Sequence, residues 1–236
     1  MIEIKGLSKS FGSEEVLKGL NYSFEPAKVY GIVGENGAGK TTLFRCIAGL
    51  ENHSGKIDFQ DGSLKGRIGL LVTNPKYMSR LTAREYLWLM LQGRGQSLSE
   101  LDEKNIFDLP LDQYADSYST GMKKKLALLA VLLQRNELFI LDEPFNGVDY
   151  SSSFLIDQII ASLREKGKYV ILSSHIFSTL TNNCDEIITM KNGTFDRVVP
   201  RSEFDQLEHD LKRDLTEQRM RKLDFLDSAP EHVQNL

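Results

Sequence analysis

The chain has few cysteines and no long apolar run. Only two of its 236 residues are cysteines, Cys46 and Cys184, and neither has neighbours at metal-ligand spacing. We therefore expect buried thiols rather than a disulfide or a zinc site, and redox chemistry is not indicated. The longest apolar run, LALLAVLL at 126–133, is far shorter than the ~20 residues that a membrane-spanning helix needs. The sequence therefore predicts no membrane-spanning segment.

An excess of basic charge is also missing. With 29 Lys and Arg against 33 Asp and Glu, the net charge of -4 gives no general attraction to nucleic acid or anionic lipid. We expect no nucleic-acid partner, and any bound anion must be held locally. The first residues, MIEIKGLSKSF, alternate apolar with polar residues and lack the apolar middle of a secretory signal. We read a strand there and expect a cytoplasmic protein.

The order of the apolar segments predicts an α/β fold. Short apolar runs at 29–34, 67–74, 138–141 and 169–174 read as buried strands, and helix-like segments separate several of them. This alternation predicts a mostly parallel sheet with crossover helices, preceded by an antiparallel β portion at the N-terminal end. Residues 51–63 read as a turn-rich hairpin.

The region at about 75–135 interrupts this pattern with helical sequence that opens with a Thr82/Glu85 capping box. We expect a helical subdomain inserted into one larger domain at 1–200. A charge-dense helical tail follows at 201–236, either lying on the core, loosely attached, or used in self-association. One face of this tail carries four apolar residues: Phe204, Leu207, Leu211 and Leu215.

The strongest local motif is GENGAGKTT at 34–42, which matches G-x-x-x-x-G-K-[ST] between a buried strand and a helix. Glycines let backbone N–H groups curl round a phosphate, and the helix start adds partial positive charge. Lys40 reaches the terminal phosphates and Thr41 holds magnesium. The motif therefore predicts nucleotide binding. Its predicted nucleotide-binding residues are Gly34, Asn36, Gly37, Ala38, Gly39, Lys40, Thr41 and Thr42.

Acidic residues follow a later buried strand. LFILDEP places Asp142 and Glu143 at a carboxyl strand end, where ligands bind in doubly wound sheets. Asp142 fits a magnesium-positioning role, and Glu143 fits a base that polarises water for attack on a γ-phosphate. The alternative is an acidic strand end facing solvent. His175 ends the next strand, and we interpret it as a γ-phosphate sensor, although a histidine after a strand is usually incidental.

The stretch YSTGMKKKLALLAVLL at 118–133 begins with an N-cap candidate, Ser119, followed by three lysines. Positive charge opposes the helix dipole there, whereas acidic residues are normally favoured. A bound anion at this helix start would resolve the conflict. The alternative is that the lysines point into water.

These motifs, in this order, resemble the ATP-binding subunit of an ABC transporter over roughly residues 2–198. In that resemblance Phe11 of KSFG is the aromatic residue that stacks on adenine, and YSTGMKKK is the family's signature segment. LFILDEPFNGVD supplies the acidic pair and the loop of Asp149, and His175 matches the switch histidine. The family's fold is a P-loop NTPase core carrying a helical subdomain, which agrees with the insertion predicted above.

The resemblance implies an ATPase that uses ATP and Mg²⁺. Two subunits meet head to tail as a homodimer, or as a heterodimer with a related ATPase. Ser119 and the Gly121 backbone of one subunit then contact the γ-phosphate held by the other, and the signature lysines lie near that polyanion. The dimer powers transport through a separate integral membrane permease, at the inner face of the cell membrane.

The alternatives are a soluble ABC-type ATPase acting on ribosomes or DNA, and a nucleotide-gated binding module with little turnover. Tyr77, Met78 and Leu81 are candidate permease contacts, with internal packing equally expected. The motif YSxGM resembles a variant found in ATPases that serve export-type permeases.

The chain also departs from the family's pattern. After IGLL the family normally has a glutamine, and this chain has Thr73 or Asn74 in its place. Either binds water or magnesium with a shorter reach, and we take Asn74 as the candidate ligand. The signature segment has Thr120 for the usual glycine and Met122 for the usual glutamine. Phe11 replaces the commoner tyrosine, which preserves stacking and loses a hydroxyl.

Overall fold

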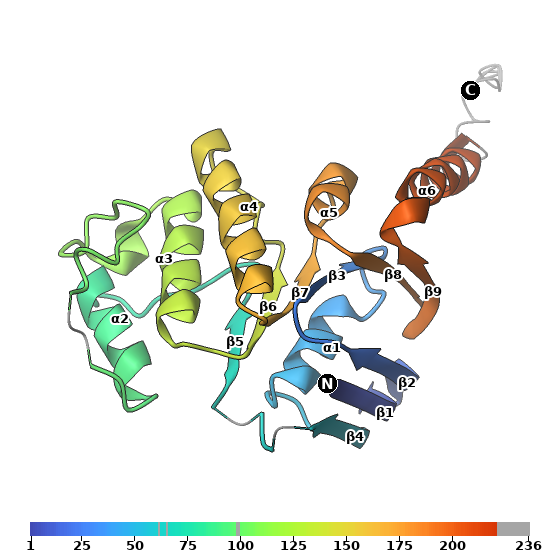
Figure 1. Ribbon diagram of the computed structural model, residues 1–236, viewed down its shortest axis with the longest axis horizontal. Coiled ribbons are helices and arrows are strands. Elements are labelled where there is room, and N and C mark those ends of the chain that lie inside the picture. Colours follow the sequence, from blue (N-terminus) through green and yellow to red (C-terminus); the bar gives the residue numbers. More distant parts are fainter. Residues whose placement is uncertain (61, 65, 98–99, 221–236) are drawn as a thin grey trace, which may run out of the picture.

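The computed structural model describes residues 1–60, 62–64, 66–97 and 100–220 (Figure 1). Its larger sheet has six strands in the order β5-β6-β7-β3-β8-β9. Neighbouring strands are parallel from β5 to β8, and β9 pairs antiparallel with β8. The strands are β3 (Lys28–Val33), β5 (Ile68–Leu71), β6 (Leu138–Asp142), β7 (Tyr169–Ser173), β8 (Glu186–Lys191) and β9 (Thr194–Pro200). The mostly parallel sheet is confirmed.

The N-terminal antiparallel portion is a three-stranded sheet in the order β2-β1-β4. It comprises β1 (Ile2–Phe11), β2 (Glu14–Phe24) and β4 (Ser54–Phe59). The hairpin expected at 51–63 is wrong: β4 is a strand that pairs antiparallel with β1. Its partner lies about fifty residues away in sequence, so no local pattern indicated the pairing.

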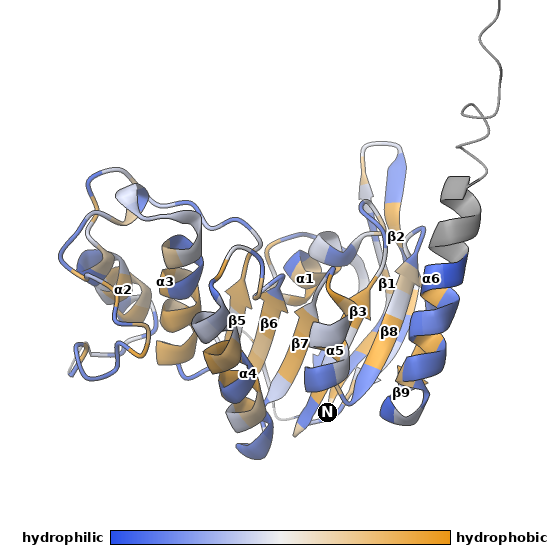
Figure 2. Cartoon of the chain, turned by 90° about the horizontal axis from the view of Figure 1, so that it is seen from above, coloured by the Kyte–Doolittle hydropathy of each residue, from blue (hydrophilic) through white to orange (hydrophobic). Residues whose placement is uncertain are grey.

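The core lies on both faces of the six-stranded sheet, because β6 and β7 are buried at every position and are apolar up to their last residues, Asp142 and Ser173. Alternate residues of β6 point to opposite faces: Phe139 and Leu141 pack toward α3 and α4, whereas Leu138 and Ile140 pack toward α1 and the small sheet. Figure 2 shows these strands as the apolar centre of the molecule. The helices are α1 (Lys40–Ile47), α2 (Ala83–Gln92), α3 (Thr120–Leu133), α4 (Tyr150–Glu165), α5 (Phe177–Asn183) and α6 (Phe204–Met220), with 3-10 turns at Ala115–Ser117 and Arg201–Glu203.

The helical insertion contains α2 and α3 and lies at the β5 end of the sheet, away from β1 and β2 (Figure 1). α2 begins with the predicted capping box: the Thr82 side chain accepts from the Glu85 N–H, and the Glu85 carboxylate accepts from the Thr82 N–H. In the part of the chain that the structure describes, no helix is long and apolar enough to cross a bilayer. Cys46 and Cys184 are buried free thiols, as expected.

The tail helix α6 packs on the core through its first turns. Phe204 and Leu207 are buried, Leu211 packs against the same core, and Asp210 pairs with Arg197 of β9 at 3.0 Å. The side chain of Leu215 and residues 221–236 lie outside the described part of the chain.

Candidate nucleotide-binding site

A cavity of about 480 Å³ opens where the phosphate loop meets the carboxyl ends of β6 and β7. Its lining combines glycine backbone, hydroxyls, carboxylates and one lysine, which is the chemistry that a nucleotide triphosphate requires. The lining residues are Phe11, Glu14, Val16, Asn36, Gly37, Ala38, Gly39, Lys40, Thr41, Thr42, Thr73, Asp142, Glu143 and His175. The structure thus brings most of the predicted site residues together, from five separate segments. Gly34, the first residue of the phosphate loop, is not among the lining residues.

The phosphate loop runs from the end of β3 to the start of α1. Gly39 occupies the N-cap of α1 with a left-handed φ of 104°, and a Cβ there would lie 2.9 Å from Leu17 Cδ2. Only glycine fits this position without strain. Lys40 Nζ folds back over the loop and donates to the carbonyl oxygens of Gly34 (2.6 Å) and Glu35 (3.1 Å). Burial lowers the Lys40 pKa, while Glu143 and Asp142 oppose that shift.

Asp142 accepts hydrogen bonds from three hydroxyls. Thr41 Oγ1 donates to Oδ2 at 3.0 Å, Thr73 Oγ1 donates to the same oxygen at 2.7 Å, and Ser173 Oγ donates to Oδ1 at 2.6 Å. These hydroxyls come from α1, from the loop after β5 and from the end of β7. The predicted pair Thr41 and Asp142 therefore meets directly.

Glu143 follows β6 with a left-handed φ of 53°, a conformation that is uncommon for a residue with a side chain. Its N–H donates to Ser173 Oγ at 3.1 Å. The carboxylate lies beside His175, whose N–H donates to Oε2 at 3.2 Å and whose Nε2 lies 3.3 Å from Oε1. Oε1 is buried and has no hydrogen-bond partner among the described residues. Glu143 thus points an unsatisfied oxygen into the site, next to a half-exposed histidine.

Asn74 is not brought to this cavity. It is exposed, whereas Thr73 lines the cavity and bonds Asp142. Both residues lie in the bend that follows β5, and this bend turns only Thr73 toward Asp142. The structure thus places Thr73 beside Asp142, and the predicted ligand Asn74 outside the cavity.

Asp149 also lies away from the cavity. Its carboxylate caps α4 by accepting from the Ser152 N–H (2.9 Å), and it accepts from the hydroxyls of Ser151 (2.6 Å) and Ser152 (2.8 Å). Lys125 Nζ donates to it at 3.2 Å. The Ser151 hydroxyl foremost, then Ser152 and Lys125, hold the Asp149 pKa well below its usual range. Within one chain, this carboxylate is engaged in capping rather than in nucleotide contact.

The start of α3 lies outside the cavity as well. Ser119 is exposed and caps the helix by accepting from the Met122 N–H at 3.3 Å. A Cβ on Gly121 would lie 2.6 Å from the Gly147 carbonyl, so the backbone of α3 packs directly on the loop after Glu143. Neither residue reaches the phosphate loop of its own chain.

The alternative that the lysines of the signature segment (residues 118–125) point into water is wrong for Lys124. Its side chain is 1% exposed, and its Nζ donates to backbone carbonyls of the site loops. Burial lowers its pKa to about 8. Lys125 is bound to Asp149 and Ser152. Lys123 remains partly exposed at the helix start.

Sequence reasoning missed two residues, Ser173 and Lys124. A signal existed for Ser173, because β6 and β7 are adjacent parallel strands whose register places Asp142 opposite Ser173. No local signal indicated Lys124, because the carbonyls that it bonds come from segments 19 to 52 residues away.

A strand, a glycine-rich loop and a helix beside an acidic strand end define a phosphate-loop nucleotide-binding protein. The model of the ABC transporter family matches residues 17–146. The chain is 30% identical over 221 residues to the lantibiotic transport ATP-binding protein SrtF of Streptococcus pyogenes, covering 89% of this chain and 93% of that protein. It is 32% identical over 225 residues to the bacitracin transport ATP-binding protein BcrA of Bacillus licheniformis, covering 88% and 71%.

Solved structures agree with this relationship. An ATP-binding subunit of an ABC transporter superposes with a TM-score of 0.75 at 25% identity, covering 85% of this chain and 90% of that one. A dimeric ATP-binding cassette with ADP and phosphate bound shares the fold, with a TM-score of 0.75 at 20% identity, covering 85% and 99%. The chain belongs to the ABC transporter family, as an ATP-binding subunit with ATPase activity.

Proposed function

We propose that this chain pairs with a second copy, or with a related ATPase subunit, around bound ATP and powers transport through a separate membrane permease. The observation that carries this proposal is the convergence of Lys40, Asp142, Glu143 and His175 on one cavity. Within the proposal, Lys40 and the phosphate-loop N–H groups bind the phosphates, and the ring of Phe11 stacks on the adenine.

Glu143 has the surroundings of a general base. Its Oε1 is buried without a hydrogen-bond partner among the described residues and lies 3.3 Å from His175 Nε2. In the proposed step, water gives a proton to Glu143 as its oxygen attacks the γ-phosphorus. The bond from that phosphorus to the bridging oxygen breaks, and the electron pair leaves with ADP. The half-exposed His175 contacts the γ-phosphate.

Magnesium fits the same corner of the cavity. Thr41 Oγ1 and Asp142 Oδ2 are hard oxygen donors 3.0 Å apart, and such oxygens are the ligands that Mg²⁺ prefers. We propose that Thr41 and Asp142 hold the ion, directly or through water. When bound, it neutralises charge on the phosphates. Thr73 and Ser173 orient the Asp142 carboxylate by donating to its two oxygens.

The exposed start of α3 favours the proposal that a second subunit completes the site. Ser119 is exposed at the positive end of a 14-residue helix and does not line its own chain's cavity. An anion is stabilised at such a helix end. We propose that Ser119 and the Gly121 backbone contact the γ-phosphate bound by the partner. The contact repeats across a two-fold axis, so each dimer encloses two nucleotides.

The permease is proposed to dock on the helical subdomain, which places the protein at the cytoplasmic face of the membrane. Met78 precedes α2 and is 71% exposed. Tyr77 is instead packed internally: its hydroxyl donates to the Lys123 carbonyl at 2.7 Å, and its ring meets Tyr86 edge-on at 4.8 Å. Among these neighbours, Met78 is therefore the contact candidate. Named relatives of this chain are transport ATP-binding proteins, which favours the permease-coupled role over one on ribosomes or DNA.

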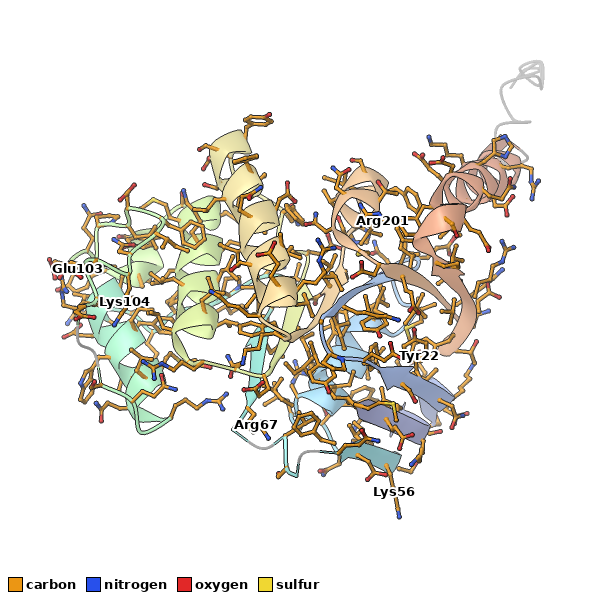
Figure 3. The ribbon with its side chains drawn as sticks, in the orientation of Figure 1. Tyr22, Lys56, Arg67, Glu103, Lys104 and Arg201 are labelled. Carbon is orange, nitrogen blue, oxygen red and sulfur yellow. The ribbon has the colours of Figure 1, made fainter. Side chains whose placement is uncertain are left out.

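The test compares ATP binding and phosphate release in matched variants. Glu143→Gln should bind ATP as wild type does and lose roughly 10²-fold or more in turnover, the contribution of a general base. Glu103→Gln makes the same chemical change at an exposed position on the outer edge of the helical subdomain (Figure 3) and should leave both unchanged. Lys40→Ala should abolish tight ATP binding. Wild-type phosphate release by Glu143→Gln would remove Glu143 from the base role.

A further inference from the structure

Lys124 is a buried lysine whose ammonium group is hydrogen-bonded to backbone carbonyls. It lies one turn into α3, and its Nζ donates to the carbonyl oxygens of Val72 (3.3 Å), Thr73 and Glu143 (3.1 Å). Within the described part of the chain, it forms no ion pair with a carboxylate. Its three N–H groups therefore match three acceptors.

These carbonyls belong to the two loops that form the acidic side of the cavity. Val72 and Thr73 follow β5, and the Thr73 hydroxyl donates to Asp142 at 2.7 Å. Glu143 follows β6 and carries the carboxylate beside His175. One side chain from the helical subdomain thus connects both loops, although it does not line the cavity itself.

Both backbone groups of Glu143, its N–H and its carbonyl oxygen, form hydrogen bonds to side chains. Its N–H donates to Ser173 Oγ at 3.1 Å, and its carbonyl accepts from Lys124 at 3.1 Å. Its left-handed φ of 53° is a conformation that the surroundings must maintain. Lys124 and Ser173 supply that support from opposite sides, the first from α3 and the second from the end of β7.

Packing alone does not require a lysine here. Burying an ammonium carries a desolvation cost, and an unbranched apolar side chain of similar length fills the same volume without it. What Lys124 provides and methionine lacks is a set of donors for the carbonyls of Thr73 and Glu143.

We propose that Lys124 is a positioning residue for ATP hydrolysis, which ties the first turn of α3 to Thr73 and Glu143 and thereby sets the place of the Glu143 carboxylate. The inference rests on the proposed function, because it assumes that Glu143 is the base.

The test separates binding from turnover in Lys124→Met and Lys124→Gln. Lys124→Met removes all donors and should lower kcat roughly 10- to 100-fold, the effect of misplacing a catalytic group by about 1 Å. Its Kd for ATP should stay near the wild-type value, because the phosphate loop does not contact Lys124. Lys124→Gln retains an N–H₂ donor and should recover part of the lost kcat. Lys56→Met, an exposed change on β4 (Figure 3), is the charge-matched control and should behave as wild type.

Two results overturn the inference. One is a kcat in Lys124→Met equal to that of wild type. The other is an equal loss in Lys124→Met and Lys124→Gln that follows their loss of ATP binding and of melting temperature, which indicates a purely structural role. Glu143→Gln is measured in parallel. If Glu143→Gln hydrolyses ATP normally, the base role of Glu143 in the proposed function fails; if it is inactive while Lys124→Met is fully active, only the role of Lys124 fails.

Discussion

Removal of the Ser173 hydroxyl tests how the acidic site is built. Ser173 is 0% exposed, donates to Asp142 Oδ1 at 2.6 Å and accepts from the Glu143 N–H at 3.1 Å. In Ser173→Ala the buried N–H loses its acceptor, which costs about 1–3 kcal/mol. Asp142 also loses a hydrogen bond to a charged group, worth about 1.5–3 kcal/mol. Because the two groups share one oxygen, these terms overlap, and we expect about 2–4 kcal/mol in total.

That loss is small enough to leave the chain folded, since domains are typically stable by about 5–15 kcal/mol. The free energy of unfolding is measured by urea titration followed by circular dichroism, together with kcat for ATP hydrolysis. We expect kcat to fall at least about tenfold, equivalent to about 1.4 kcal/mol, because Glu143 is no longer held at its N–H.

Ser54→Ala is the matched control, because it removes an exposed hydroxyl whose hydrogen bond is 3.4 Å long. It should change the free energy of unfolding by less than about 0.5 kcal/mol. A change of the same small size in Ser173→Ala, with kcat unaffected, would refute the view that Ser173 supports Asp142 and Glu143.

Three further predictions concern the elements around the site. Thr82→Ala breaks the capping box of α2 and should lower the free energy of unfolding by about 1 kcal/mol in urea titrations, whereas no change would show that α2 does not depend on its cap. Gly121→Ala brings a Cβ to 2.6 Å from the Gly147 carbonyl, so α3 must shift and ATP hydrolysis should fall; unchanged turnover would mean that this close approach is dispensable. Asp149→Asn should melt below wild type at pH 7. Because the folded-state pKa of Asp149 is depressed, its contribution is present above the unfolded-state pKa of ~3.9 and is lost as the pH falls below it. The melting difference should therefore shrink below about pH 4, and a difference independent of pH would contradict the ionised cap.

The parts of the fold that the sequence predicted are those with strong local patterns. β6 and β7 are buried at every position and apolar up to their last residues, Asp142 and Ser173, and GENGAGKTT matches a phosphate-loop motif that is found between a strand and a helix. β4 escaped prediction because its pairing with β1 is a long-range contact.

Within the site, Asn74 was preferred over Thr73 because composition alone does not decide which of two neighbours faces the cavity. The burial of Lys124 could not be predicted from the sequence for a related reason. Its position in the first turns of α3 suggested exposure, and only the tertiary approach of Thr73 and Glu143 provides the carbonyls that make burial tolerable.

In the proposed dimer, two chains enclose ATP, with Ser119 of one chain at the γ-phosphate of the other. The most direct measurement is the sedimentation of Glu143→Gln with and without ATP, alone and combined with Ser119→Glu. Glu143→Gln should sediment as a dimer only with ATP, and the added Ser119→Glu carboxylate should repel the partner's phosphate and leave monomers. A dimer that persists with Ser119→Glu, or a wild-type monomer that hydrolyses ATP at full speed at every protein concentration, would contradict the account.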